Sequence, residues 1–416
     1  MHRRFTVALL VALVACVSPA AGRLSIPSSV VVAPHDEPKT IRAAFAERSY
    51  SPGEQAILTL RAPVPTVTIK ILHAGLEGGK AKRSDVMRGV PVSRVRRVEL
   101  GGTRRVVVPV GAWKSGVYVA RIEAPGGYLG FAPLIVRSRS VERPRVAVVL
   151  PTNTWQAYNF RDVDGDGVGD TWYAEPHIPC VDLSRPYLDR GVPAARIRGF
   201  LRWFEHGRRT AEFLSDDDLD RVQSGGELAH RYDFILFASH EEYVTTHVYD
   251  IVTRFRDLGG NLAFLSADTF FYRIERRGNR ICRTGRWKDL GRVDATLTGV
   301  HYLGWWERQH PSKPYAARQV SRAPWFFRGT GLRSGDPIGV GYGVEIDGVT
   351  QDSPAGIVVL ADIRDLFGPG RTATMTYYET RRGAKVFAAG AMGFESPQTP
   401  VHRKLLDNLW VRLVRP

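Results

Sequence analysis

The sequence predicts a doubly wound α/β domain preceded by an all-β sandwich, and two contrasting patterns support this. In the first part, short runs of strand-forming residues are separated by turns rich in glycine and proline, which is typical of a sandwich. In the second part, continuous apolar runs alternate with helical patterns, which indicates strands buried on both faces of a parallel sheet. A polar segment, "RSRSVERPR" (137–145), is the expected linker.

The predicted sandwich covers residues 24–140 and is expected to be immunoglobulin-like. Its turns include "SYSPGE" and "APGGY", where proline and glycine supply the backbone angles that turns require. The expected strands are 41–47, 55–62, 66–73, 105–110, 117–124 and 127–137.

The predicted α/β domain covers residues 144–416 and opens with the apolar strand "RVAVVLP" (145–151). Apolar spacing predicts helices over 195–207, 243–260 and 399–414, the second of which ends on a glycine. The motif "HEEY" is expected to open this second helix, with its acids in the first turn. Further strands are expected at 231–239, 261–268, 356–362, 372–380 and 384–392. This alternation is the basis of the doubly wound prediction.

The first residues, "MHRRFTVALLVALVACVSPAAG", have the layout of a secretory signal, with two arginines, an apolar run and then small residues. We therefore expect residues 1–22 to be a signal peptide and the protein to be secreted or held on the outer face of the cell envelope. The residues around Cys16 also resemble a bacterial lipoprotein box, which would give a lipid anchor at that cysteine. Simple secretion and lipid anchoring both remain open.

The formal net charge is +16, but the basic residues are scattered among apolar ones as expected for solvated strand faces. Nucleic-acid binding requires a clustered stripe, so no nucleic-acid partner is expected. The general field allows weak affinity for anionic wall polymers or lipid headgroups. Cys180 and Cys282 could pair in an oxidising compartment, although the sequence does not show whether they are close together.

The candidate site lies in the loops that follow three predicted strands, because ligands of open α/β sheets bind beyond the carboxyl ends of the strands. These loops are "TNTWQAYN", "HEEY" and "GFES". We take His240, Glu241 and Glu395 as the candidate catalytic residues. The full set expected around the crevice is Trp155, Tyr158, Asn159, Ser239, His240, Glu241, Glu242, Tyr243 and Glu395.

Each of these residues also has a structural interpretation. The aromatic residues could belong to the core, and Glu241 and Glu242 could be charges at a helix start. Two histidines in "HEEYVTTH" are seven residues apart, roughly 10 Å along a helix, which is too far for one zinc ion. No glycine-rich phosphate loop follows the first strand, and Ser239 beside His240 is a weaker serine-hydrolase alternative.

The motifs "TWQAYN", "SRPY", "FASHEEY", "DLGGNLAFLSAD" and "FFYRIE" resemble the C-terminal domain of the N,N-dimethylformamidase large (beta) subunit family over most of residues 145–416. The resemblance implies a class I glutamine-amidotransferase-like α/β fold after a β domain. It also implies hydrolysis of a small amide by one iron ion held by two tyrosines and a glutamate. On the matching positions the ligands would be Tyr158, Tyr187 and Glu242, with Glu395 as a neighbouring acid.

Phenolate and carboxylate oxygens suit ferric iron and would sharpen it as a Lewis acid. The chain departs from the family pattern at two places. It has Ser239 where the family has a glycine and reads "HEEYV" where the family reads "HDEYW", and a longer loop, "FRDVDGDGVGDTWY", follows "AYN".

That longer loop contains "DVDGDGVGD", whose aspartates Asp162, Asp164, Asp166 and Asp170 match positions 1, 3, 5 and 9 of an EF-hand loop. Position 12 is Tyr173 in place of the bidentate glutamate, so a static calcium site is expected, with Glu175 as a further ligand candidate. The alternative is a solvated Asp-Gly turn.

Two functions remain open at this point. The first is an exported, metal-dependent amidohydrolase acting on a small amide. The second is a non-catalytic envelope protein that binds a glycan or wall polymer through Trp155, Trp172, Trp305 and Trp306.

Overall fold

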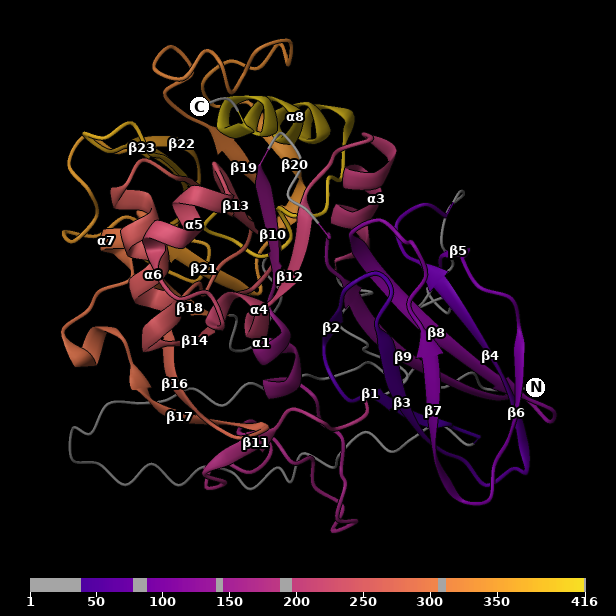
Figure 1. The fold of residues 1–416 in the computed structure, drawn as a ribbon. Helices are drawn as coiled ribbons and strands as arrows, with labels where there is room; N and C mark the ends of the chain where they lie inside the picture. Colours follow the sequence, from indigo (N-terminus) through magenta and orange to yellow (C-terminus); the bar gives the residue numbers. More distant parts are fainter. Residues whose placement is uncertain (1–38, 78–87, 140–144, 188–196, 306–311, 415–416) are drawn as a thin grey trace, which may run out of the picture.

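The computed structural model describes residues 39–77, 88–139, 145–187, 197–305, 312–414, which form five sheets (Figure 1). The expected signal peptide with Cys16, the middle of the expected linker and Trp306 lie outside these residues. No helix among the described residues is both long enough and apolar enough to cross a membrane.

The N-terminal part consists of two sheets that share one apolar core. In β3, buried Ala56, Leu58 and Leu60 alternate with more exposed residues, which is the period-two pattern of a half-buried strand. The first sheet has the order β1 (Arg42–Phe45), β3 (Gln55–Arg61), β7 (Thr103–Pro109). The second has the order β2 (Ser49–Tyr50), β9 (Tyr128–Val136), β8 (Gly116–Ala124), β4 (Thr66–His73), β5 (Val90–Pro91), with β6 (Arg96–Glu99) also paired to β4.

A nine-stranded sheet forms the centre of the second part, and its two halves differ in direction. Five strands are mutually parallel, in the order β12 (Glu212–Ser215), β10 (Val146–Leu150), β13 (Phe234–Phe237), β15 (Asn261–Phe264), β24 (Lys385–Ala388). Four antiparallel strands continue it, in the order β23 (Ala373–Glu379), β22 (Val358–Ile363), β19 (Lys313–Ala317), β20 (Pro337–Tyr342).

Helices pack against this sheet in two separate apolar clusters. One contains residues of α3 (Arg198–His206) and α8 (Pro400–Val414), and the other contains residues of α5 (Gly225–Arg231) and α6 (Thr246–Asp257). The remaining helical elements are short: α1 (Thr152–Ala157), α4 (Asp216–Asp220), η1 (Lys288–Leu290) and α7 (Ala295–Thr298).

Two smaller sheets complete the fold. One has the order β11 (Cys180–Asp182), β17 (Arg280–Arg286), β16 (Tyr272–Arg277), β14 (Tyr243–Thr245), and the other pairs β18 (His301–Trp305) with β21 (Glu345–Gly348). Cys180 lies opposite Cys282 in the β11–β17 register, and the two form a disulfide. The structure thus settles the pairing that the sequence left open.

The predicted fold class is wrong. The described chain is mostly β-sheet, with 37% of its residues in strands and 18% in helices, and it is not a doubly wound, class I glutamine-amidotransferase-like fold preceded by a sandwich. Between β15 and β24 the described residues form eight strands and only short helical turns, so strand and helix do not alternate among them. The runs at 356–362 and 372–380 are apolar enough for a parallel sheet, but the strands they form pair antiparallel. The apolar pattern of a buried strand does not indicate its direction.

The expected helix over 243–260 also begins later than predicted. Residues 243–245 form β14, and α6 begins at Thr246, with the Thr245 side chain accepting a hydrogen bond from the Val248 N–H. Glu241 and Glu242 therefore do not lie in the first turn of a helix.

Candidate functional site

The candidate site lies at the edge of the central sheet where the parallel strands β10, β13 and β15 end. Tyr158 caps α1, which directly follows β10. His240 and Glu242 follow β13, and Asp268 follows β15. Because the carboxyl ends of parallel strands meet at one edge, three segments that are far apart in sequence bring their polar residues together.

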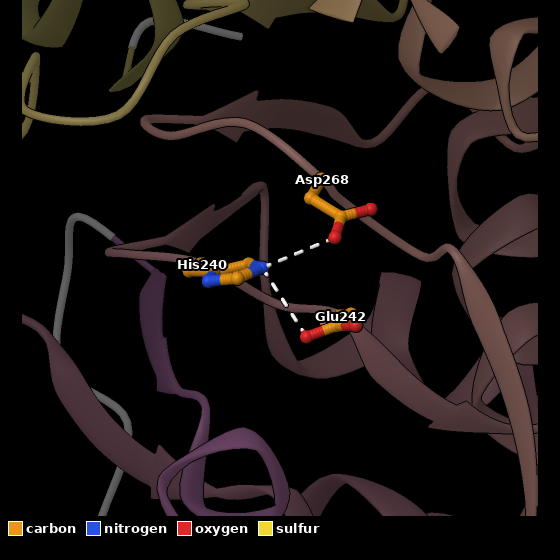
Figure 2. Close-up of side chains that lie close together, drawn as sticks. All are labelled: His240, Glu242 and Asp268. Atoms are coloured by element: carbon orange, nitrogen blue, oxygen red, sulfur yellow. Dashed lines mark ion pairs between the residues drawn. The ribbon is translucent and has the colours of Figure 1, made fainter. Parts of the chain in front are cut away.

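His240 is the centre of this group, which Figure 2 shows in part. Its Nε2 atom lies 3.4 Å from Glu242 Oε2, 3.5 Å from Asp268 Oδ2 and 3.1 Å from Glu345 Oε2. The side chain of His240 is 10% exposed and those of the three acids are 5% exposed or less. His240, Glu242 and Asp268 each direct a ligand-type atom to within 4.8 Å of the others, which is close enough for one metal ion to contact all three.

Several buried oxygens of the group lack hydrogen-bond partners. Within the described part of the chain, no hydrogen bond is made by the Tyr158 hydroxyl, by Asp268 Oδ1 or by Glu345 Oε2. His240 Nε2 likewise makes no hydrogen bond of normal geometry, although three carboxylates surround it. A buried polar atom without a partner costs about 1–3 kcal/mol. Convergent donors that do not satisfy one another fit a bound cation, which would remove that cost.

The pKa values of the buried acids and of Tyr158 also fit a bound cation. Burial raises the pKa of Glu242, of Asp268 and of Glu345, and the carboxylates raise one another's values further in Asp268 and Glu345. Burial, followed by the charges of Glu242 and Glu345, also raises the pKa of Tyr158 well above its usual value. A bound cation would lower all of these pKa values, because it stabilises the anionic form of every neighbour.

Two further tyrosines surround Glu242. The Tyr173 hydroxyl donates to Glu242, at 3.1 Å from Oε1 and 3.2 Å from Oε2, and lies 2.5 Å from the Tyr243 hydroxyl. The Tyr173 ring stacks on that of Tyr158, with centroids 4.3 Å apart. The Glu242 N–H donates to Thr154 Oγ1 at 3.1 Å, which ties the loop after β13 to α1. The phenols of Tyr158 and Tyr173 and the carboxylate of Glu242 therefore lie close together.

A second layer of titratable groups lies around this centre. Burial raises the pKa of Glu395 to about 7, while its own N–H, the Gly393 N–H and nearby His240 act in the opposite direction. Burial also raises the pKa of Asp347 to about 7. In addition, His301 Nδ1 lies 2.6 Å from Asp294 Oδ1 in a buried pair that influences Asp347.

The backbone is strained at the same place. Asp268 has φ +52°, Phe270 has φ +57°, and Val344, beside Glu345, has φ +74°. Positive φ is rare for residues other than glycine, and for a β-branched residue such as valine it is a true outlier. Strain of this kind gathers at functional sites, because the surrounding structure must hold it in place.

Two predicted site residues lie apart from His240. Burial and the neighbouring Asp216 carboxylate raise the pKa of Glu241, so this side chain faces Asp216, which is itself bonded to Thr152 and to the Asn153 N–H. Tyr187 lines a cavity with Trp155 and Gln156, and its charged neighbours are Arg48, Arg185 and Asp216. Neither residue has Glu242 among these neighbours.

The other residues that the sequence singled out have structural contacts. Trp155 and Trp172 are buried in apolar clusters, at 8% and 3% exposure. The Asn159 amide donates to Gln156 and to the Pro186 carbonyl. Among the described contacts, no hydrogen bond joins the Ser239 hydroxyl to His240, whose Nε2 faces carboxylates instead.

The aspartate loop is a separate and more exposed feature. Asp162 Oδ1 accepts from the Gly165 N–H at 2.6 Å and its Oδ2 from the Gly167 N–H at 3.0 Å, while Asp170 accepts from the Val163 N–H. Gly165 and Gly167 have φ +87° and +91°, which glycine adopts easily. Asp162, Asp164 and Asp166 are close enough together to hold a cation.

Sequence reasoning missed Asp268, Glu345, Asp347 and Tyr173 as site residues. Asp268 carried a usable signal, because it follows a buried strand at the edge where ligands bind. Glu345 and Asp347 are acids two apart on β21 and thus share a face, but it is the contact of β21 with the segment after β24 that places them at this edge: the Asp347 N–H donates to the Gly390 carbonyl and the Met392 N–H donates to the Glu345 carbonyl.

This mostly β protein carries a buried cluster of tyrosine, histidine and carboxylate side chains at one edge of its central sheet. Residues 102–397 match the family model described as N,N-dimethylformamidase beta subunit-like, C-terminal. The chain therefore belongs to that family, as the sequence resemblance indicated. The match begins within the strands of the N-terminal sheets.

No curated protein matches the chain. A cycloisomaltooligosaccharide glucanotransferase of Paenibacillus sp., complexed with cycloisomaltoheptaose, shares 13% identity with a TM-score of 0.18, over 42% of this chain and 27% of that chain. The PapD-like domain of human CEP192 shares 14% identity with a TM-score of 0.16, over 29% of this chain and 100% of that chain. Likenesses this weak support no statement about fold or function.

Proposed function

We propose that the protein is a metal-dependent hydrolase that cleaves the C–N bond of a small amide. The family supports an amidohydrolase-like role. The observation that carries the proposal is the set of buried donors around His240 that do not satisfy one another. The expected location, outside the cell or on the outer face of the envelope, is part of the same proposal.

The metal in this proposal is iron held by Tyr158, Tyr173 and Glu242. Phenolate and carboxylate oxygens are hard anionic donors that suit it, and these three residues are in mutual reach. Tyr173 takes the place that the resemblance gave to Tyr187. A bound ferric ion supplies Lewis acidity, which polarises an amide carbonyl and lowers the pKa of water.

The chain's own residues then transfer the protons of the reaction. His240 Nε2 can exchange a proton with any of three carboxylates at 3.1–3.5 Å. In the metal-free protein, burial raises the pKa of Glu395 to about 7, and a bound cation would lower this pKa and favour the carboxylate, which suits a base that takes a proton from water and returns it to the leaving amine. The water oxygen adds to the carbonyl carbon, the C–N bond breaks, and the products are a carboxylate and an amine. Glu241 is no longer a candidate for this role, because it faces Asp216.

Absorption spectroscopy of iron-loaded protein, combined with metal analysis, tests this proposal. Tyrosinate bound to ferric iron gives a visible charge-transfer band, so the wild-type protein should be coloured. Tyr158→Phe and Tyr173→Phe should each lose or shift the band, since only a phenol oxygen is removed. Tyr187→Phe is the matched control and should keep it. A band that depends on Tyr187 and not on Tyr173 would restore the original ligand assignment, and a protein that takes up no metal would contradict the proposal.

The alternative of a wall-polymer binding protein has less support. Trp155 and Trp172 are core residues and offer no exposed aromatic platform. No specific observation among the described residues favours this function.

A further inference from the structure

The candidate site contains more anionic donors than one iron ion needs. Iron held by Tyr158, Tyr173 and Glu242 has two phenolates and one carboxylate, which together balance the charge of one ferric ion. Asp268 and Glu345 are left over, and their side chains are buried, at 5% and 1% exposure. The proposed iron ion therefore accounts for only part of the buried group.

The Nε2 atom of His240 faces these two acids. Figure 2 shows this nitrogen directed toward Asp268 and Glu242. It lies 3.5 Å from Asp268 Oδ2, and 3.1 Å from Glu345 Oε2. Among the described residues, neither His240 Nε2 nor Glu345 Oε2 makes a hydrogen bond of normal geometry, although both atoms are buried. Two unpartnered atoms from different segments thus point at one place.

The spacing of these atoms suits a metal ion. An ion that lies about 2.1 Å from each ligand of a tetrahedron places those ligands about 3.4 Å apart. The three carboxylate oxygens around His240 lie 3.1–3.5 Å from its Nε2 atom. One imidazole nitrogen with several carboxylate oxygens is a donor set that suits zinc. A divalent ion would also balance the charges of Asp268 and Glu345.

The surroundings of the two acids favour a cation over two free carboxylates. Burial, followed by the charges of three neighbouring acids, raises the pKa of Asp268 well above its usual value. Burial is also the largest cause of the raised pKa of Glu345, and His240 acts in the opposite direction. The backbone is strained at both places, with φ +52° at Asp268 and +74° at Val344, beside Glu345. A cation between the two acids would stabilise both ionised forms.

We propose that His240, Asp268 and Glu345 hold a second, divalent cation beside the iron. Glu242 is shared between the two ions, since its Oε1 lies 3.1 Å from the Tyr173 hydroxyl and its Oε2 lies 3.4 Å from His240 Nε2. This second site rests on the proposed function and extends it from one cation to two.

A second cation changes the roles within the proposed reaction. Paired cations suit hydrolysis, because they can polarise the substrate carbonyl and the attacking water separately. His240 then serves as a ligand, and proton transfer is left to Glu395. The substrate class, a small amide, is unchanged.

Metal analysis of reconstituted protein tests the second site. Metal-free protein incubated with iron and zinc together should retain one equivalent of each after gel filtration. Zinc is colourless, so the visible tyrosinate band reports the iron site alone and should persist. Competition with a coloured zinc chelator then measures the Kd for zinc in the iron-loaded protein.

Asp268→Asn and Glu345→Gln separate the two sites. Each variant keeps the shape of the side chain and removes its charge. Each should bind zinc at least a hundredfold more weakly, which is more than the loss of a supporting residue causes. Each should also keep one equivalent of iron with its visible band, which shows that the variant is folded. Glu241→Gln is the matched control and should bind both metals normally, because this buried acid faces Asp216.

The other outcomes are distinct from one another. If zinc only displaced iron, so that the protein never held more than one cation, the second site would be wrong and the iron site would stand. If Asp268→Asn or Glu345→Gln lost the visible band with an unchanged melting temperature, these acids would belong to a single centre, which also contradicts the second site. If zinc bound and depended on both acids in a protein that took up no iron, the site proposed here would stand and the iron site would be wrong.

Discussion

The chain contains two groups of acidic residues that could hold cations, and the two differ in how their negative charge is accommodated. Around His240 the acids are buried, several of their oxygens lack partners, and burial raises their pKa values. In the aspartate loop Asp164 and Asp166 are exposed and Asp162 is half-buried, and the hydrogen bond from the Gly165 N–H is the main cause of the lowered pKa of Asp162. The first group therefore has oxygens left for a cation or a proton, whereas the second is already satisfied by its own loop.

The largest expected effect of this difference is on how the free energy of unfolding of the metal-free protein depends on pH. Because burial raises the folded-state pKa of Asp347 and of Glu395 to about 7, the folded protein binds protons that the unfolded chain releases near pH 4. Stability should therefore fall as the pH rises from about 4 to about 7 and level off above pH 7, with a loss of roughly 3–4 kcal/mol for each group over that range. Urea unfolding of metal-free protein at several pH values between about 4 and 8 measures this slope.

Two comparisons sharpen that measurement. Glu395→Gln should flatten the slope, since it removes one of the two groups. Iron-loaded protein should lose less stability as the pH rises, because the cation favours the ionised carboxylates. Metal-free stability that increases toward pH 8 would contradict the burial of uncompensated acids at this site.

A smaller effect is expected on metal affinity when single carboxylates are changed. Glu242→Gln keeps the shape and removes the charge, and it should weaken iron binding at least a hundredfold, more than is typical for residues that only support a ligand. Glu241→Gln is the neighbouring control and should bind iron normally, because that side chain faces Asp216. Metal titration of both variants distinguishes the two acids, and the reverse result would reassign the ligand.

The smallest effect is expected at the aspartate loop, where we still predict calcium binding. A fivefold excess of calcium over Kd would add about 1 kcal/mol of stability, so chelation should lower the melting temperature by a few degrees at most. Asp164→Ala with Asp166→Ala should abolish the response. Equal melting temperatures with calcium and with chelator would make the loop an ordinary Asp-Gly turn.

The sequence predicted individual elements better than their arrangement. Each of the six strands expected before residue 140 coincides with an observed strand, because period-two burial and turn residues are local signals. The fold class was wrong because strand direction and pairing are decided by distant partners, as in the antiparallel β22 and β23. Tyr158, His240 and Glu242 could be grouped from strand ends. Glu345 could not, because its approach to His240 depends on the contact of β21 with the segment after β24.

The disulfide has a consequence for the unfolded chain. Cys180 and Cys282, 102 residues apart in sequence, close a covalent ring that contains His240, Glu242 and Asp268, the three residues of Figure 2. An oxidised chain that has lost its tertiary structure still confines these three donors to one loop, so their effective concentration for one another stays high. Tyr158 and Glu345 lie outside the ring and must join it each time the protein folds. Oxidation therefore keeps three of these five residues in one covalent loop each time the protein unfolds and refolds.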